Sequence, residues 1–117
     1  MSEECQQYQD EVDRISEDLR TNEQELFQAE AKVNEIDGRL QNMHSDYFER
    51  YYDVPPQDRW KVEMGGEEIL MEEMRRELEA AVAVMDNLIG YRELLATLLE
   101  KAEDDLKCCE QRCWMPK

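Results

Sequence analysis

The chain has 117 residues, of which 38% are charged and 41% hydrophobic, and 30 acidic against 14 basic residues give a net charge of −16. This length suits one small domain. The acidic balance argues against direct binding to nucleic acid or to anionic membranes, and no apolar run is long enough to span a bilayer. Because no secretory signal follows Met1, we expect an intracellular, cytoplasmic protein.

The first predicted helix covers residues 3–52. Apolar residues recur along it at alternating spacings of three and four, which is the seam of a coiled-coil helix. The seam consists of Cys5, Tyr8, Val12, Ile15, Leu19, Asn22, Leu26, Ala29, Val33, Ile36, Leu40, Met43 and Tyr47. Asn22 is its polar interruption. Pro55 and Pro56 then end the helix, since each removes a backbone donor.

Residues 53–66 are predicted to form a turn between two helices. Within it, residues 57–62 can make a single helical turn, and the Gly65-Gly66 pair provides the permissive backbone needed to start the next helix. Aromatic residues gather at this end, and tyrosine and tryptophan often anchor interfaces. The predicted recognition tip consists of Tyr47, Phe48, Tyr51, Tyr52 and Trp60. A cluster that only stabilises the turn explains these residues equally well.

The second predicted helix covers residues 67–113 and is followed by a short tail, 114–117. It repeats the three-four seam from Met71 to Cys113, and Arg92 is the charged residue within that seam. Its flanks carry further apolar side chains, whereas the flanks of the first helix are polar. An apolar patch beyond the seam usually marks an interface. The predicted partner-binding residues are Val82, Val84, Ile89, Tyr91, Leu94 and Leu98.

Together these patterns predict an all-α fold, an antiparallel two-helix coiled-coil hairpin forming one domain over residues 1–117. We expect self-association or a partner helix to complete it to a bundle. The favoured register sets Asn22 beside Arg92, so that the two polar seam residues share a layer, and it sets Cys5 beside Cys109. The alternative is a parallel dimer through the first helix alone, in which Asn22 pairs with its own copy.

Four cysteines, Cys5, Cys108, Cys109 and Cys113, allow more than one redox state. Without an export signal, buried reduced thiols are the default expectation. In an oxidising compartment, Cys5 together with Cys109 or Cys113 could form a disulfide that clamps the open end of the hairpin. Their spacing differs from that of structural zinc sites, and the only histidine is His44, so no metal site is predicted.

Nothing in the sequence indicates catalysis. No glycine-rich phosphate loop is present, and the carboxylates fall on the solvent faces of the predicted helices, so we predict no enzyme activity, no cofactor and no small-molecule substrate. The favoured function is a coiled-coil adaptor or structural subunit that mediates protein-protein assembly, with a helical protein or its own copy as partner. The alternatives are a chaperone-like cofactor that binds a client with its aromatic tip, and an acidic nucleic-acid mimic that inhibits a basic protein.

Overall fold

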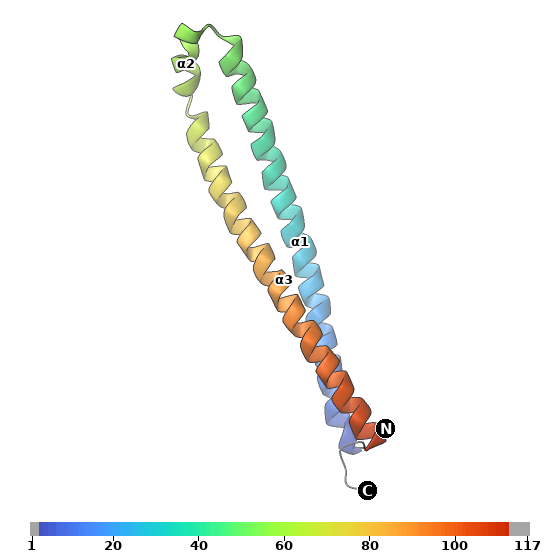
Figure 1. Cartoon of the computed structure of the whole chain (residues 1–117). Coiled ribbons are helices and arrows are strands. Elements are labelled where there is room, and N and C mark those ends of the chain that lie inside the picture. The colour runs from blue at the N-terminus through green and yellow to red at the C-terminus, as the bar shows by residue number, and fades with distance from the viewer. Residues whose placement is uncertain (1–2, 113–117) are drawn as a thin grey trace. The chain divides into compact units, whose positions relative to one another are not determined.

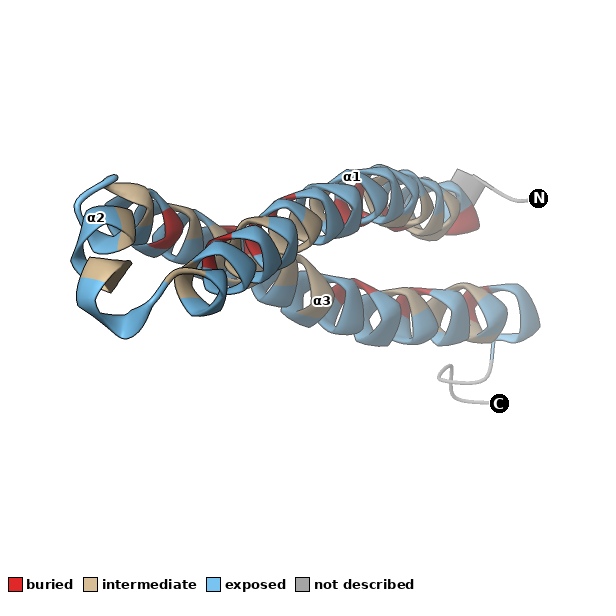
Figure 2. Ribbon diagram, turned by 90° about the horizontal axis from the view of Figure 1, so that it is seen from above, coloured by how far each residue is buried: buried red, intermediate tan, exposed pale blue. Residues whose placement is uncertain are grey.

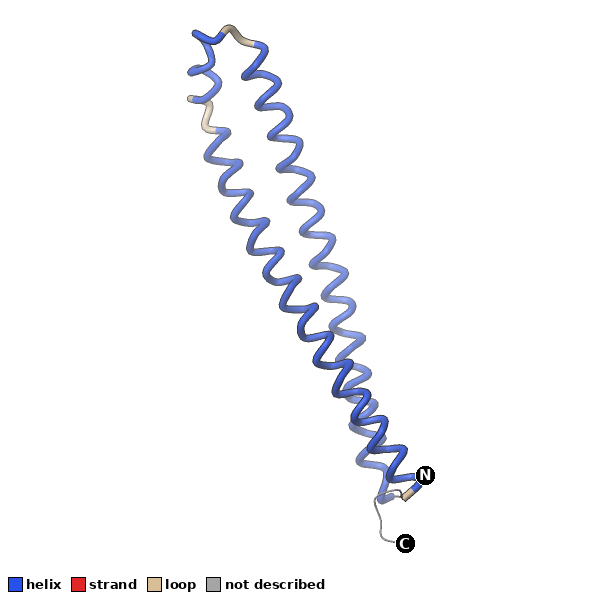
Figure 3. Tube along the Cα trace, in the orientation of Figure 1, coloured by secondary structure: helices blue, strands red, loops and turns tan. Residues whose placement is uncertain are grey.

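The structure, a computed structural model, describes residues 3–112 and is all-α. Helix α1 spans Glu3–Asp53, and helix α3 spans Glu67–Gln111 (Figure 1). Between them lie a 3-10 turn at Pro56–Asp58 and the short helix α2 at Arg59–Glu63. The described residues contain no strand, and loop is confined to the segments joining these elements and to the end of α3 (Figure 3).

The helices pack in two units, each formed by α1 and α3 running in opposite directions (Figure 1). The first, called here the end unit, joins the described residues up to Phe27 with those from Asp86 onward. The second, called the turn unit, comprises Gln28–Met85. The predicted all-α helical hairpin is therefore confirmed. The predicted tail, 114–117, lies outside the described residues.

The core of the end unit is the predicted seam of both helices. Ile15 of α1 and Leu95 of α3 are each 3% exposed and pack with Ala102. Partly buried apolar residues surround them, namely Val12, Leu19 and Leu99. Figure 2 shows buried positions recurring at intervals along α1 and α3. Full burial of such a side chain contributes about 1.5 to 3 kcal/mol, which explains why the three-four spacing determines the pairing.

The core of the turn unit forms around Tyr47. This side chain is only 2% exposed and packs with Leu40 and Met71, and its hydroxyl donates a hydrogen bond to the carboxylate of Glu68. Further apolar side chains complete the cluster, namely Met43, Tyr51, Val62, Met74 and Leu78. Because Val62 belongs to α2, the short helix is held against the same core as the two long ones.

The turn is built by residues with special backbone properties. Pro55 and Pro56 follow the end of α1, and Gly66 precedes α3 with φ +79°, a left-handed conformation that glycine adopts without strain. Arg50 at the end of α1 forms an ion pair with Glu67 at the start of α3. The hydrogen bond that Arg50 donates within this pair holds the pKa of Glu67 below its usual value. The ion pair joins the ends of the two long helices directly.

The two polar seam residues, Asn22 and Arg92, have different surroundings. Asn22 is 2% exposed and its Nδ2 donates to the backbone carbonyl of Leu88 at 3.0 Å, whereas Arg92 is exposed. The Oδ1 atom of Asn22 is buried and has no partner among the described residues. The predicted register holds where it sets Cys5 beside Cys109, and within it the polar contact of Asn22 is with the backbone of Leu88. A long arginine can reach water and avoid the cost of burying its charge, while a short amide cannot.

Replacing Asn22 by leucine should raise the free energy of unfolding by about 1 to 2 kcal/mol, because it removes a buried acceptor without a partner and adds apolar contacts. Urea unfolding at one protein concentration measures the change. Asn22→Asp is the matched control, and it should destabilise the protein by burying a charge at the same place. A leucine variant no more stable than the natural chain would contradict this account.

Candidate interaction surface

The structure divides the predicted partner-binding residues into two groups. Val82 and Ile89 are half-buried. The others are exposed, each with 40% to 55% of its surface open to solvent, and they are Val84, Tyr91, Leu94 and Leu98. Val84 lies in the turn unit, while the other three lie in the end unit. Val84, Tyr91 and Leu98 are seven residues apart and Leu94 lies beside them, so the exposed apolar surface is concentrated along one flank of the α3 seam.

In the end unit, Tyr91, Leu94 and Leu98 form what we call the α3 apolar face. Their spacing of three and four places them together on one side of the helix. The neighbouring seam residue Leu95 is 3% exposed because it packs against α1. One side of α3 is therefore buried in the core of the end unit, and an adjoining side presents large apolar groups to solvent.

A small ionic network on α1 adjoins this face. Arg14 forms salt bridges with Glu11 at 2.5 Å and with Asp18 at 3.5 Å. The hydrogen bond with Glu11 is the main cause that raises the pKa of Arg14. Exposed pairs of this kind add little to stability, so their main effect is to offset acidic charge beside the apolar residues.

A shallow groove of about 180 Å³ lies in the same unit. Its lining residues come from both helices and are Tyr8, Glu11, Ile15, Leu98, Lys101, Ala102 and Asp105. Leu98 belongs both to this groove and to the α3 apolar face. The groove thus combines apolar walls with charged groups of both signs, a composition that suits a protein side chain with an apolar body.

The turn unit has a hollow of its own, of about 200 Å³. It is lined by Lys32, Glu77, Ala80, Ala81 and Val84. Val84, an exposed member of the predicted partner-binding set, therefore borders a hollow that is separate from the groove of the end unit.

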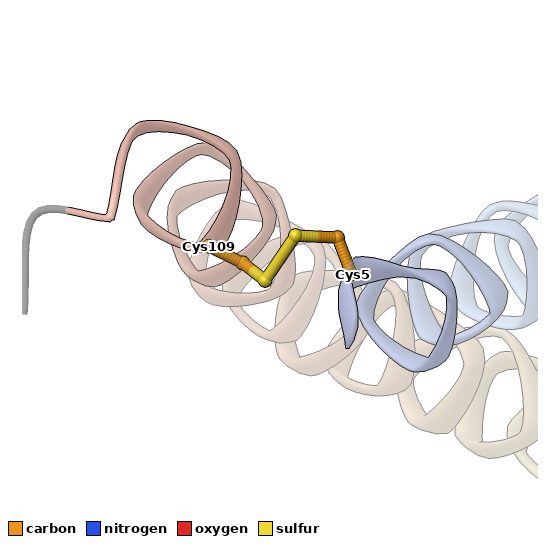
Figure 4. The surroundings of a disulfide bond; sticks show 2 residues. All are labelled: Cys5 and Cys109. Atoms are coloured by element: carbon orange, nitrogen blue, oxygen red, sulfur yellow. A yellow bond between two sulfur atoms is a disulfide. The ribbon is translucent and has the colours of Figure 1, made fainter. Parts of the chain in front are cut away.

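A disulfide joins Cys5 of α1 to Cys109 of α3 in the end unit (Figure 4). The two Cα atoms are 5.7 Å apart, and both residues are buried. The default expectation of reduced thiols is wrong for this pair, because the seam brings the two cysteines together. Cys108 is not a free thiol either, and Cys113 lies outside the described residues. Between residues 3 and 112, no cluster of histidine, cysteine and acidic side chains has a geometry suited to a metal ion.

The predicted recognition tip also separates into two groups. Tyr47 is buried in the core of the turn unit, and Tyr51 is half-buried beneath Arg59, whose guanidinium lies 5.0 Å from the ring centroid. The exposed members are Phe48, Tyr52 and Trp60, at 40%, 64% and 53%. Tyr47 and Tyr51 therefore stabilise the turn, and the other three remain available to a partner.

Sequence reasoning missed several exposed apolar residues. They are Phe27, Met64, Ile69 and Leu70, each more than half exposed. Ile69 and Leu70 directly precede the first seam residue of the second helix, and Met64 precedes the glycine pair. Their positions outside the seam were the sequence signal that these apolar side chains would be exposed.

No protein-family model matches the chain, and searches among curated proteins and solved structures likewise return no match. The helices of the described part of the chain include none with the length and apolar character required to cross a bilayer. The surface itself is thus the basis for a functional argument.

Proposed function

We propose that this protein is a non-enzymatic helical adaptor or structural subunit that assembles with another protein through the α3 apolar face. The observation that carries the proposal is the exposure of Tyr91, Leu94 and Leu98 on a side of α3 that adjoins its buried seam. Contiguous apolar surface on a soluble protein commonly marks an interaction site. Covering it gains about 25 cal/mol for each Å² of apolar area removed from water.

The shape of the surface favours a helical partner. An amphipathic helix binds by placing side chains spaced at three and four residues along an apolar groove or face. The α3 apolar face has that spacing, and the groove beside Leu98 offers a place for an anchoring side chain. Glu11 lines the same groove as Leu98 and is paired with Arg14, so this ion pair would form part of the polar rim of the interface.

Tyr91→Asp and Leu98→Asp should each weaken partner binding about tenfold or more, because each places a charge in a desolvated contact. Binding should persist in about 0.5 M salt, since apolar contacts are not screened. The measurement is the partner's dissociation constant, with thermal melting of each variant recorded in parallel. Phe27→Asp is the matched control, because Phe27 is 74% exposed in the same unit but belongs to α1.

Retention of binding in both α3 variants would refute the proposal. Loss of binding in salt, with tolerance of both substitutions, would instead favour an acidic mimic that occupies a basic groove. Exposure of Phe48, Tyr52 and Trp60 supports a second candidate, a chaperone-like cofactor that holds a client with its tip. Trp60→Ala in the same assay separates the two, since it should leave binding through α3 unchanged.

A further inference from the structure

The end unit carries a second three-four seam on α3, distinct from the one that packs on α1. We call it the outer seam, and it consists of Asn87, Tyr91, Leu94, Leu98, Lys101 and Asp105. Asp105 is half-buried, and the other five residues are exposed. Alternating spacing of this kind is the pattern that packs against a further helix. The outer seam includes the whole α3 apolar face and continues it with polar residues at both ends.

The outer seam is complementary to its own reversed copy. In an antiparallel helix pair, alternate seam positions face each other, so placing Leu94 opposite Leu98 of a second copy fixes every other pairing. Tyr91 then faces Lys101, and Asn87 faces Asp105. An ammonium group is attracted to the face of an aromatic ring, and an amide donates hydrogen bonds to a carboxylate. Each layer therefore combines groups that attract each other, and a two-fold axis repeats each pairing.

The groove in the end unit supplies a place for Tyr91 of the second copy. Lys101, the residue opposite Tyr91 in this register, lines the groove together with the apolar side chains of Tyr8, Ile15 and Ala102. The groove measures about 180 Å³, and cavities of about 150 Å³ can accept a benzene ring. An aromatic side chain entering there would meet apolar side chains, the ammonium group of Lys101 and the carboxylates of Glu11 and Asp105.

The charge distribution also favours self-association through this surface. With a net charge of −16, two copies repel each other over most of their surface. The outer seam contains one basic residue, Lys101, and one acidic residue, Asp105, so it carries no net charge. It therefore joins exposed apolar area with a balance of charge that most of this acidic surface lacks.

We propose that the outer seam is the interface of an antiparallel dimer of this chain, with Leu94 and Leu98 at its two-fold axis. This proposal rests on the proposed function, in which a protein partner covers the α3 apolar face. It identifies that partner as a second copy of the chain. Such an interface is isologous, because the same residues contribute from both copies. Two hairpins joined in this way bring four helices together, as in a helical bundle.

Sedimentation equilibrium of the full chain tests whether the dimer exists. The natural chain should be dimeric, and the dimer should tighten as salt is raised, because screening weakens the repulsion between two acidic copies. The double variant Leu94→Asp/Leu98→Asp should weaken the dimer about a hundredfold. A chain that is monomeric at all salt concentrations would overturn the proposal, and so would a dimer unaffected by this double variant.

The orientation is tested by two further double variants, Leu94→Lys/Leu98→Lys and Leu94→Asp/Leu98→Lys. The proposed register places position 94 opposite position 98, so the mixed variant should dimerise more tightly than either variant with two like charges. A parallel pair would place like charges opposite each other in the mixed variant and make it weak. If net charge alone determined affinity, the double lysine variant would form the tightest dimer. A weak mixed variant or a tightest double lysine variant would each refute the register.

The same variants distinguish failure of this inference from failure of the proposed function. If the natural chain is monomeric but binds another protein, and Tyr91→Asp and Leu98→Asp abolish that binding, the adaptor function stands and the second copy is excluded as the occupant. If the chain neither dimerises nor binds through this face, both proposals fail.

Discussion

Replacing Cys5 by serine should lower the free energy of unfolding by about 3 to 5 kcal/mol. The bond between Cys5 and Cys109 joins residues with a sequence separation of 104. Such a bond restricts the unfolded chain, and closing a loop of about 100 residues is worth about 4.7 kcal/mol in the chain-entropy description. The change is measured by urea unfolding without reductant at one protein concentration, with the helical circular dichroism signal as the probe.

The partner substitution provides the control. Cys109→Ser should have the same effect as Cys5→Ser, and the double variant should cost little more than either single change, because all three remove the same bond. Substitution isolates this bond better than a reductant does. Because Cys108 is not a free thiol, a reductant would act on its bond as well. Additive effects of the two serines would show that each cysteine stabilises the fold independently of the other.

Replacing Tyr47 by alanine should destabilise the protein by about 3 to 5 kcal/mol, the usual cost of deleting a buried aromatic side chain. Tyr47 is 2% exposed in the core of the turn unit, so the lost contacts leave a cavity. Tyr47→Phe keeps the ring and removes only the hydroxyl that donates to Glu68. It should therefore cost about 0.5 to 1.5 kcal/mol.

The phenylalanine variant should also change how stability depends on pH. The hydrogen bond to Glu68 and burial raise the pKa of Tyr47 above its usual value. Because an unfolded tyrosine ionises near pH 10, the unfolded chain loses this proton first, and stability declines as the pH rises above about 10. Tyr47→Phe should reduce that decline without abolishing it, since the pKa of Tyr51 is also raised. An unchanged alkaline slope would contradict the assignment.

Much of the fold follows from the seams alone. The three-four spacing predicted helices over 3–52 and 67–113, and the structure has them at Glu3–Asp53 and Glu67–Gln111. Such spacing is informative because burial of one helix face dominates the energetics of a helix pair. Proline and glycine marked the turn for an equally local reason, since they restrict or free the backbone directly.

Spacing does not determine how a polar seam residue is satisfied or which redox state a cysteine takes. Asn22 and Arg92 interrupt equivalent seams, yet side-chain length decides that one bonds a backbone carbonyl and the other reaches water. The reduced state of Cys5 was inferred from the expected compartment, whereas the structure places its sulfur beside that of Cys109.

The candidate surfaces show the same limit. Heptad position identifies apolar flanks but not how much of each flank is covered, so Ile89 is half-buried while Leu94 is 53% exposed. At the tip, Tyr47 continues the seam of the first helix and is buried, whereas Tyr52 lies outside the seam and is exposed. Membership of the seam therefore distinguishes these two tyrosines.

The Cys5–Cys109 bond has a mechanical consequence. Residues between these cysteines lie inside a covalent loop, and a pulling force applied to segments attached outside them passes directly from one sulfur atom to the other. The core contacts of both units then carry no load, and tension at these ends cannot peel α1 from α3. Without this bond, the same tension acts on the first turn of α1 and the last turn of α3, where only noncovalent contacts oppose it.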